Sequence, residues 1–451
     1  MPWVTDANAA LLTDLYELTM AASYHRHGMT HDATFDLFVR ELPRHRNFLV
    51  VAGLEEALHY LEELNFDAES LEYLASLEMF DPAFLDYLST LRFTGDVWAM
   101  PEGTVAFARE PLLSVTAPLI EAQIVETFLL NAITFQTMIA SKAARVDIAV
   151  GERSFIDFSL RRDHGADAGL KAARASFIGG AAATSNVLAG SLFGIPVNGT
   201  MAHSYVMSFD SEVDAFRTFA RDFPDRAVLL IDTFDVIRGA HRAVEVAQEL
   251  ADEGVHLRAV RIDSGDLGAL ARDVRAILDD AGLHDTQIVL SGDLDEYRVK
   301  ELIEGEVPVD AFGVGTQMGT SADAPSLGGV YKLVWDERSG PKVKLSTGKV
   351  TLPGRKQVHR FTGPDGRFHT DMISLNKEEI HGSTPLLEKV MMEGERTHDP
   401  EPLVEMQRRC LASLHALPGH LLSLEQDANY VVDLSPDLRS LEREAALHFR
   451  A

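Results

Sequence analysis

The stretch LRAVRIDSGDLGALARDVRAILDDA, residues Leu257–Ala281, contains the unit that decides the fold. Its apolar start, Leu257–Ile262, predicts a buried strand. Its second half predicts a helix, because apolar residues recur at helical spacing and Gly282 follows as a stop signal. The polar residues Asp263–Asp266 lie between these two segments. The unit is therefore a strand, a polar turn and a helix.

The same unit recurs through the middle of the chain. The segments that predict strands are Ser154–Phe158, Ser176–Ile178, Ile195–Val197, Ala227–Ile231, Leu257–Ile262, Gln287–Leu290 and Ala311–Val314. Helical patterns such as Asp235–Gly254 lie between them. This alternation predicts a parallel sheet, and the polar strand ends predict an irregular TIM-like α/β barrel with its site at the carboxyl ends. Because about six or seven units can be recognised, we expect a complete eight-stranded barrel.

The remaining segments predict a second domain of the α+β class. Residues 1–135 mix strand and helix patterns, and we assign residues 136–340 to the barrel. Residues 341–451 contain a strand-rich stretch, Lys342–Arg360, that we expect to rejoin the N-terminal domain, followed by a helical tail. In that stretch we interpret Arg355-Lys356 as a solvated turn rather than a phosphate contact.

Composition restricts the partners. The formal net charge of −28 argues against a nucleic-acid or anionic-membrane surface, because both require basic patches. The single cysteine, Cys410, excludes an intrachain disulfide and a Cys-based zinc site. The N-terminal residues lack the basic start and apolar core of a signal peptide, and no apolar run is long enough to span a membrane. We therefore expect a cytoplasmic protein.

His203 is the leading candidate for the chemical centre. The expected strand Ile195–Val197 runs into small polar residues and then into His203-Ser204. A titratable nitrogen and a hydroxyl thus follow the carboxyl end of a strand. A histidine in such a loop is more often a hydrogen-bonded structural residue than a catalyst. The polar ends of the other strands favour the catalytic interpretation.

Those other strand ends carry groups suited to a phosphorylated substrate. Glycines beside Ser264, Ser291 and Thr316 allow backbone amides to approach a phosphate, and Phe312–Thr316 has the composition of a phosphate cup. Arg161 and Arg261 are natural anion partners, whereas we expect Arg162 at the surface. Carboxylates that could hold Mg²⁺ on a pyrophosphate are Asp232, Asp263, Asp266 and Asp293. For Asp263 and Asp266, helix N-capping is an equally good explanation.

Seven blocks, in order along most of the chain, resemble the nicotinate phosphoribosyltransferase family. They are Thr13–Met20 (TDLYELTM), Asp157–Arg162 (DFSLRR), Ser185–Gly190 (SNVLAG), Gly199–Ser204 (GTMAHS), Val260–Leu267 (VRIDSGDL), Phe312–Thr316 (FGVGT) and Gly329–Val334 (GVYKLV). The resemblance is weakest beyond about Asn376. It implies an irregular α/β barrel with a domain built from the two chain ends, and a homodimer with shared sites. The implied reaction makes nicotinate mononucleotide and pyrophosphate from nicotinate and phosphoribosyl pyrophosphate, with Mg²⁺ and coupled ATP hydrolysis, in NAD salvage; it belongs to the ligase class.

The resemblance also implies roles for individual residues. His203 matches a histidine that ATP phosphorylates. Asp14 and Tyr16 match residues lent across the dimer interface, with Tyr16 stacking on the pyridine ring and Phe158 on its opposite face. Asp263 and Asp293 fall near the ribose. The other implied substrate-binding positions are Arg161, Ser204, Arg261, Ser264, Gly292, Gly315 and Thr316, and the implied metal positions are Asp232 and Asp266.

Three alternatives remain at this point. A nicotinamide-using relative would be expected to carry an acid just before the SNVLAG block, and Gly180–Asn186 contains none, which favours a carboxylate substrate. An aldolase forming a Schiff base would need a lysine at a strand end, for which Lys332 is the candidate. A non-catalytic binding role is the least favoured alternative, because several polar strand ends converge.

Overall fold

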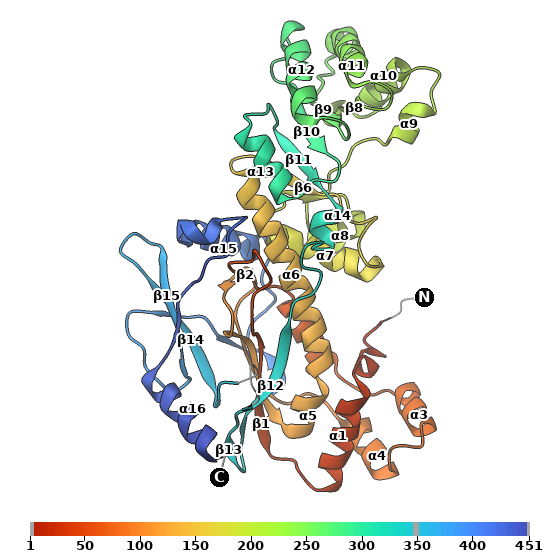
Figure 1. The fold of residues 1–451 in the computed structure, drawn as a ribbon. Coiled ribbons are helices and arrows are strands. Elements are labelled where there is room, and N and C mark those ends of the chain that lie inside the picture. Colours follow the sequence, from red (N-terminus) through yellow and green to blue (C-terminus); the bar gives the residue numbers. More distant parts are fainter. Residues whose placement is uncertain (1–3, 346–350, 449–451) are drawn as a thin grey trace. The chain divides into compact units, whose positions relative to one another are not determined.

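The computed structural model describes residues 4–345 and 351–448 (Figure 1). The chain separates into two compact units, one made of Met1–Ser141 with Ser326–Ala451 and the other of Lys142–Pro325. The first boundary falls within the long helix α6 (Glu126–Val150). Of the expected strand-rich stretch 342–360, residues 346–350 lie outside the described residues.

The first unit contains an antiparallel sheet of seven strands in the order β13-β12-β1-β5-β3-β17-β18. The interior strand β1 is buried on both faces after its first residue, and its buried positions are apolar except for Thr34 and Asp36. The strands are β1 (Asp32–Val39), β3 (Asp96–Ala99), β5 (Pro111–Pro118), β12 (Gly329–Asp336), β13 (Gly340–Pro341), β17 (Glu388–Met392) and β18 (Glu395–Arg396). The helices that belong to this unit's N-terminal part are α1 (Leu15–Arg26), α2 (Leu54–Glu63), α3 (Ala68–Ser76), α4 (Pro82–Thr90) and α5 (Leu119–Ile124).

Two smaller sheets complete the first unit. One has the strand order β16-β14-β15-β19 and the other pairs β2 with β4. Their strands are β2 (Leu49–Val50), β4 (Val105–Ala106), β14 (Lys356–Thr362), β15 (Phe368–Leu375), β16 (Thr384–Pro385) and β19 (Val432–Leu434). The late helices are α15 (Leu403–Ala416) and α16 (Pro436–His448), visible in blue in Figure 1.

The interpretation of Arg355-Lys356 as a solvated turn is wrong. Lys356 is buried, and its ammonium group lies 2.9 Å from the carboxylate of Asp36. The guanidinium of Arg355 lies 4.0 Å from the ring centroid of Trp335 and donates to the hydroxyl of Thr34. The polar partners Thr34 and Asp36 are more than three hundred positions away along the chain, so local composition could not reveal them.

The second unit contains the predicted parallel sheet, and it confirms the α/β class. Its six strands have the order β7-β6-β11-β10-β9-β8, with every pair parallel. They are β6 (Ser154–Asp157), β7 (Ala183–Thr184), β8 (Val228–Leu230), β9 (Ala259–Ile262), β10 (Gln287–Ser291) and β11 (Ala311–Val314).

Two of the expected strands differ. Residues 176–178 form the last turn of helix α7 (Ala166–Ile178), because a short apolar run cannot distinguish a strand from a buried helical segment. The segment Ile195–Val197 contributes only a single bridge between Thr184 and Val197. Within the described residues, this unit is therefore an open sheet of six strands, and the expected eight-stranded closure is absent from them.

Side-chain caps start the helices that follow these strands. In each cap, a side-chain oxygen accepts a hydrogen bond from the backbone N–H three residues further along the chain. The capping residues are Asn186, Ser211, Asp235, Asp266 and Asp295. The capped helices are α8 (Val187–Phe193), α10 (Glu212–Asp222), α11 (Val236–Leu250), α12 (Leu267–Asp280) and α13 (Glu296–Glu304). The short helices α9 (His203–Met207) and α14 (Thr316–Gly319) follow other strand ends.

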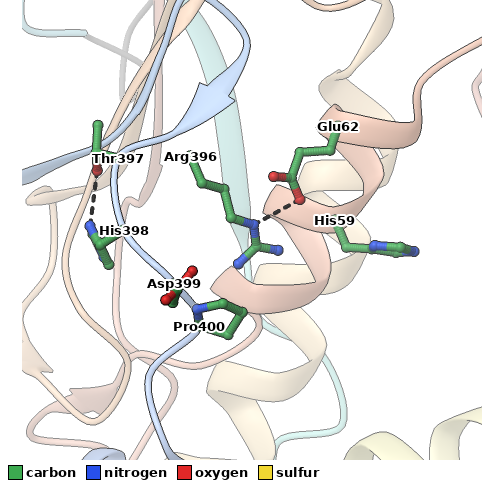
Figure 2. A pocket seen from close by; sticks show the side chains of 7 residues that line it. All are labelled: His59, Glu62, Arg396, Thr397, His398, Asp399 and Pro400. Carbon is green, nitrogen blue, oxygen red and sulfur yellow. Dashed lines mark hydrogen bonds and ion pairs between the residues drawn. The ribbon is translucent and has the colours of Figure 1, made fainter.

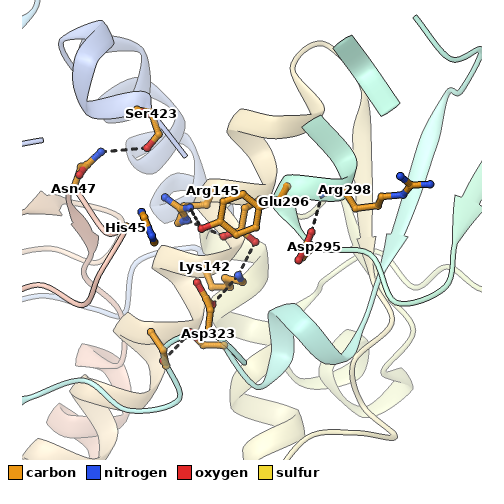
Figure 3. A network of polar contacts seen from close by, with 12 residues as sticks. His45, Asn47, Lys142, Arg145, Asp295, Glu296, Arg298, Asp323 and Ser423 are labelled. Carbon is orange, nitrogen blue, oxygen red and sulfur yellow. Dashed lines mark hydrogen bonds and ion pairs between the residues drawn. The ribbon is translucent and has the colours of Figure 1, made fainter. Parts of the chain in front are cut away.

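A buried ion network fixes α13 within this unit (Figure 3). Glu296, the first residue of α13, is fully buried and lies 2.5 Å from the ammonium of Lys142 and 2.8 Å from the guanidinium of Arg145. These two cations hold the pKa of Glu296 below its ordinary value despite burial. Lys142 also reaches Asp323 at 2.8 Å. Among the described helices, none is long and apolar enough to span a membrane.

Candidate active site

Arg261 organises the carboxyl ends of three neighbouring segments in the second unit. From β9 its guanidinium donates to Ser291 at 2.8 Å, to Thr200 at 3.0 Å and to Asp263 at 2.5 Å. The hydroxyl of Ser291 donates to the same oxygen of Asp263 at 2.5 Å. Arg261 is held in one orientation by these charge-assisted bonds. Its guanidinium also lies 5.2 Å from the ring centroid of Phe158.

His203 lies beside a second group of residues in the same unit. Its Nδ1 is 3.2 Å from the hydroxyl of Thr233 and 3.8 Å from Oδ1 of Asp232. The other oxygen of Asp232 accepts from the backbone of Asp263 and from the hydroxyl of Ser264 at 2.7 Å. The His203 side chain is 43 % exposed, whereas that of Asp232 is fully buried. The structure thus brings together four predicted residues: His203, Asp232, Asp263 and Ser264.

Glycines permit the close approach of these strand ends. Gly292 has a φ of +99°, and a Cβ there would lie 2.0 Å from the backbone oxygen of Asp263. Asp293 follows it with a φ of +47°, in the left-handed region that side chains seldom adopt. A Cβ at Gly313 would lie 2.5 Å from the ring of Phe158. The predicted strand-end residues Phe158, Arg261, Asp263 and Gly292 are therefore in mutual contact or linked through one neighbour.

Two predicted positions, Gly315 and Thr316, lie where β11 passes into α14. Gly315 precedes the first residue of the helix, Thr316, and its backbone approaches the carbonyl of Phe158. Arg161 and Arg162 are both exposed, and they lie in the turn after β6. The expectation of a surface Arg162 is confirmed.

The predicted metal positions differ from each other. Asp266 caps α12 by accepting from the backbone of Ala269 at 3.1 Å, so the capping explanation holds for Asp266 but not for Asp263. Oδ1 of Asp232 is buried and makes no hydrogen bond. In the described part of the chain, no group of three His, Cys, Asp or Glu side chains is arranged to hold a metal ion. A Mg²⁺ carried by substrate phosphates needs only one or two carboxylates, and Asp232 fits that role.

Asp14 and Tyr16 lie at the start of α1 in the first unit. Tyr16 is 46 % exposed, and burial of its hydroxyl with nearby Glu126 and Glu17 raises its pKa. Glu17 is buried, accepts from Thr13 at 2.5 Å and from Thr127, and burial raises its pKa to about 7.

Lys332 does not lie at the end of a parallel strand, as the aldolase alternative requires. It occupies the middle of the antiparallel strand β12, where its ammonium donates to the carbonyl of Tyr331 and lies 3.5 Å from Glu126. This placement removes the only lysine that favoured a Schiff base.

Two hollows lie in the first unit. One, of about 580 Å³, is lined by the acids Glu41 and Asp427 and by four arginines, namely Arg40, Arg44, Arg46 and Arg109. The arginines outnumber the acids, so the lining carries a net positive charge. The other, of about 690 Å³, is shown in Figure 2. Its Arg396 is bound to Glu55 at 2.5 Å and to Glu62 at 2.7 Å, so this cation is already neutralised.

Sequence reasoning missed several residues of the candidate site. Thr200 and Thr233 bond Arg261 and His203. Thr200 lies in the recognised block Gly199–Ser204 and Thr233 directly follows the predicted metal position Asp232, but nothing local distinguishes either from an ordinary turn residue. The arginine-lined hollow had one signal, the basic pair Arg44 and Arg46. Their convergence with Arg40 and Arg109 depends on the tertiary fold.

The fold and the candidate site together define an α/β protein with a cluster of charged and hydroxyl groups at the carboxyl ends of its parallel strands, the place where open α/β enzymes bind their ligands. Family models for the N-terminal and C-terminal domains of nicotinate phosphoribosyltransferase match residues 11–134 and 381–442. A nicotinate phosphoribosyltransferase of Mycobacterium tuberculosis is 47 % identical over 93 % of this chain and 90 % of its own length. That of Bacillus subtilis is 42 % identical over 83 % and 78 %.

A solved structure agrees with these sequence relatives. Human nicotinic acid phosphoribosyltransferase superposes with a TM-score of 0.86 at 31 % identity, covering 96 % of this chain and 99 % of the human chain. The chain belongs to the nicotinate phosphoribosyltransferase family.

Proposed function

We propose that this chain transfers the phosphoribosyl group of phosphoribosyl pyrophosphate to nicotinate. The bond between ribose C1 and the pyrophosphate oxygen breaks, and a bond from C1 to the pyridine nitrogen forms. The products are nicotinate mononucleotide, on a salvage route to NAD, and pyrophosphate. The observation that carries the proposal is the Arg261–Asp263–Ser291 cluster beside Asp232 and His203, in a chain of this family.

The charges of the site suit this displacement. The sugar becomes cation-like at C1 as pyrophosphate leaves, and the carboxylates of Asp263 and Asp293 would stabilise it. Arg261 and Arg161 offer guanidinium groups to the nicotinate carboxylate and the phosphates. Phe158 offers a ring face for the pyridine, and Ser204, Ser264, Gly292, Gly315 and Thr316 line the phosphate side. A carboxylate substrate suits the neutral segment Gly180–Asn186 better than an amide does.

The coupling to ATP is assigned to His203. The terminal phosphoryl group of ATP would move to a ring nitrogen of His203 and release ADP, and water would later release phosphate from the histidine. The exposed ring can meet a nucleotide, while Thr233 contacts Nδ1 and fixes the orientation of the ring. A charge placed there would change the electrostatics around the leaving pyrophosphate. This coupling would place the enzyme in the ligase class.

Mg²⁺ would accompany the phosphates. Asp232, with its unpartnered Oδ1, is the described carboxylate best suited to receive such an ion, whereas Asp266 is occupied in capping α12. The ion would neutralise charge on the leaving pyrophosphate. The chain's own contribution is to keep Asp232 buried and oriented through Ser264.

A homodimer would complete the site. Leu15 and Tyr16, at the start of α1, are 50 % and 46 % exposed, which suits a surface that meets a second copy. In that arrangement Asp14 and Tyr16 of one protomer would serve the site of its partner, with Tyr16 stacking on the pyridine opposite Phe158.

The test incubates the purified protein with γ-labelled ATP, Mg²⁺, nicotinate and phosphoribosyl pyrophosphate. Wild type should form nicotinate mononucleotide and an acid-labile protein-bound label. His203→Ala should lose the label and the ATP-dependent part of product formation. His256→Ala, an exposed histidine before β9, is the matched control and should retain both.

Product without label on wild type would contradict the phosphohistidine while leaving the transferase in place. Comparable turnover of nicotinamide would contradict the assigned substrate. Absence of both label and nicotinate-dependent product would contradict the proposed function.

A further inference from the structure

A serine hydroxyl joins two carboxylates directly after β6 in the second unit. Ser159 is fully buried, and its Oγ lies 2.6 Å from Oδ1 of Asp157 and 3.0 Å from Oδ2 of Asp163. Asp157 is already well supplied with donors, because the backbone of Ser159 and the hydroxyl of Thr184 also bond to it. Asp163 has no comparable set of donors: its Oδ1 is buried and makes no hydrogen bond.

Counting hydrogens shows that this arrangement lacks one proton when both acids are ionised. The hydroxyl of Ser159 has a single hydrogen, and carboxylates only accept. If Ser159 donates to Asp157, its contact with Asp163 becomes a hydrogen bond only when Asp163 carries a proton and donates. Protonation would also remove the charge from an acid whose second oxygen has no donor, and an uncompensated buried charge is costly.

The position of Asp163 connects this proton to the candidate active site. Gly319, the last residue of α14, packs so closely that a Cβ there would lie 2.2 Å from Oδ1 of Asp163 and 2.3 Å from Cβ of Ser159. The neighbouring residue Phe158 donates its backbone N–H to Val314 at 2.8 Å. The turn that carries Phe158 and Arg161 is therefore packed against the segment that carries Gly315 and Thr316.

We propose that Asp163 is a positioning residue that, when protonated, donates to Ser159 and fixes the turn carrying Phe158 and Arg161 against α14. Substrate then meets an ordered surface formed by this turn and Gly315-Thr316. When Asp163 ionises, its contact with Ser159 becomes a contact between two acceptors, and the turn loosens. The inference rests on the proposed function for its kinetic consequence, which is a weaker apparent affinity for phosphoribosyl pyrophosphate.

The charges around Asp163 agree with titration near neutrality. Burial, followed by the charge of Asp157, raises the pKa of Asp163 to about 6, and the hydrogen bond with Ser159 and the charge of His164 oppose the shift. From α7, Gly169 approaches Asp163; the same helix contains Lys171, paired with Asp167 at 2.7 Å, and the buried Arg174. Helix α14 has no titratable residue.

The kinetic test measures KM for phosphoribosyl pyrophosphate between pH 5 and pH 7.5 for wild type and Asp163→Asn. Asparagine keeps a donor for Ser159 but cannot ionise, so the ratio of wild-type to variant KM should rise about three- to tenfold over this range. The ratio removes the titration of the substrate itself. Asp167→Asn changes a neighbouring exposed carboxylate, and its KM ratio to wild type should stay constant with pH. When Ser159 is replaced by alanine in both proteins, the KM ratio between aspartate and asparagine at position 163 should no longer change with pH. A constant ratio for Asp163→Asn would overturn the proposal.

A second readout does not need catalysis. Because the pKa of Asp163 is raised in the folded chain, wild type should lose stability relative to Asp163→Asn as pH rises from about 4 to about 6. The difference in Tm should change by about 2 °C or more between pH 4.5 and pH 6.5. If no nicotinate-dependent product forms, the proposed function fails, and a pH-independent difference in Tm then overturns the inference about Asp163 as well.

Discussion

Charged side chains are placed differently in a small sheet of the first unit and at the strand ends of the second. In the first unit, Arg360 is buried, its guanidinium lies 5.5 Å and 4.3 Å from the ring centroids of Phe107 and Phe368, and it binds Asp371 at 2.6 Å. In the parallel unit, the charged groups at the strand ends remain accessible: the side chains of Asp263 and His203 are 31 % and 43 % exposed. The same residue types therefore stabilise a sheet of the first unit and, at the strand ends of the second unit, include groups that stay accessible. The second unit also holds a buried network of its own around Glu296, so burial has to be judged residue by residue.

The largest expected effect is on the buried pair of the first unit. Asp371→Ala would remove the carboxylate that binds the buried Arg360, and Tyr430 would lose an acceptor at 3.0 Å. We expect the free energy of unfolding, measured by urea denaturation, to fall by about 3–5 kcal/mol. Replacing both partners with apolar residues, Arg360→Met with Asp371→Leu, should recover most of this loss. If Asp371→Ala has the same free energy of unfolding as wild type, the ion pair does not stabilise the sheet.

The corresponding change in the second unit should affect activity rather than stability. Arg261→Ala removes donors to Ser291, Thr200 and Asp263. We expect kcat/KM to fall by about 100-fold, as for the loss of charged hydrogen bonds worth roughly 1.5–3 kcal/mol. Arg258→Ala is the matched control, because Arg258 is exposed before the amino end of the same strand. Equal losses in both variants would contradict a special role for Arg261.

A pH experiment would sharpen the comparison at Glu17. Its folded-state pKa of about 7 is above the ordinary 4.5, so the unfolded chain releases this proton first as pH rises. The free energy of unfolding should therefore fall between about pH 4.5 and pH 7, by roughly 2–3 kcal/mol, and this decline should be absent in Glu17→Gln. The exposed Glu69→Gln should behave like wild type. A Glu17→Gln profile parallel to that of wild type would contradict the assignment.

The smallest expected effect concerns surface pairs. Arg221 and Glu253 lie 2.6 Å apart, yet their side chains are 45 % and 47 % exposed. Water and salt screen such pairs, so Arg221→Ala should leave Tm unchanged within error in differential scanning calorimetry. A clear loss of Tm would show that proximity alone, without burial, stabilises this protein.

The sequence predicted the parallel unit well because its signals are local. Strand, polar turn and helix follow one another within a short segment, so β9 and α12 were recognisable directly from Leu257–Ala281. The same reasoning grouped Asp232 with Asp263 and Ser264, since parallel strands place their carboxyl ends at one edge, and the structure shows them hydrogen-bonded. It failed at residues 176–178, where a buried helical turn and a short strand have the same apolar composition.

The first unit depends on contacts between residues that are far apart in the sequence, so no short stretch of sequence reveals them. Asp36 and Lys356 form a buried ion pair, although the whole parallel unit lies between them in the sequence. The joining of Ser159, Asp157 and Asp163 through one hydroxyl was also unpredictable, because the proton count appears only once distances are known. Roles that depend on a partner subunit, such as those of Asp14 and Tyr16, stay predictions.

The pairing of β1 has a consequence for biosynthesis. One edge of this central strand meets β5, which leaves the ribosome about eighty residues later, while the other meets β12, about three hundred residues later. The parallel unit, complete at residue 325, can therefore fold while β1 still presents an unpaired edge. Such an edge is a template for association with other nascent chains. The order of translation thus makes the N-terminal sheet, and not the parallel unit, the part of this chain that most needs protection before synthesis ends.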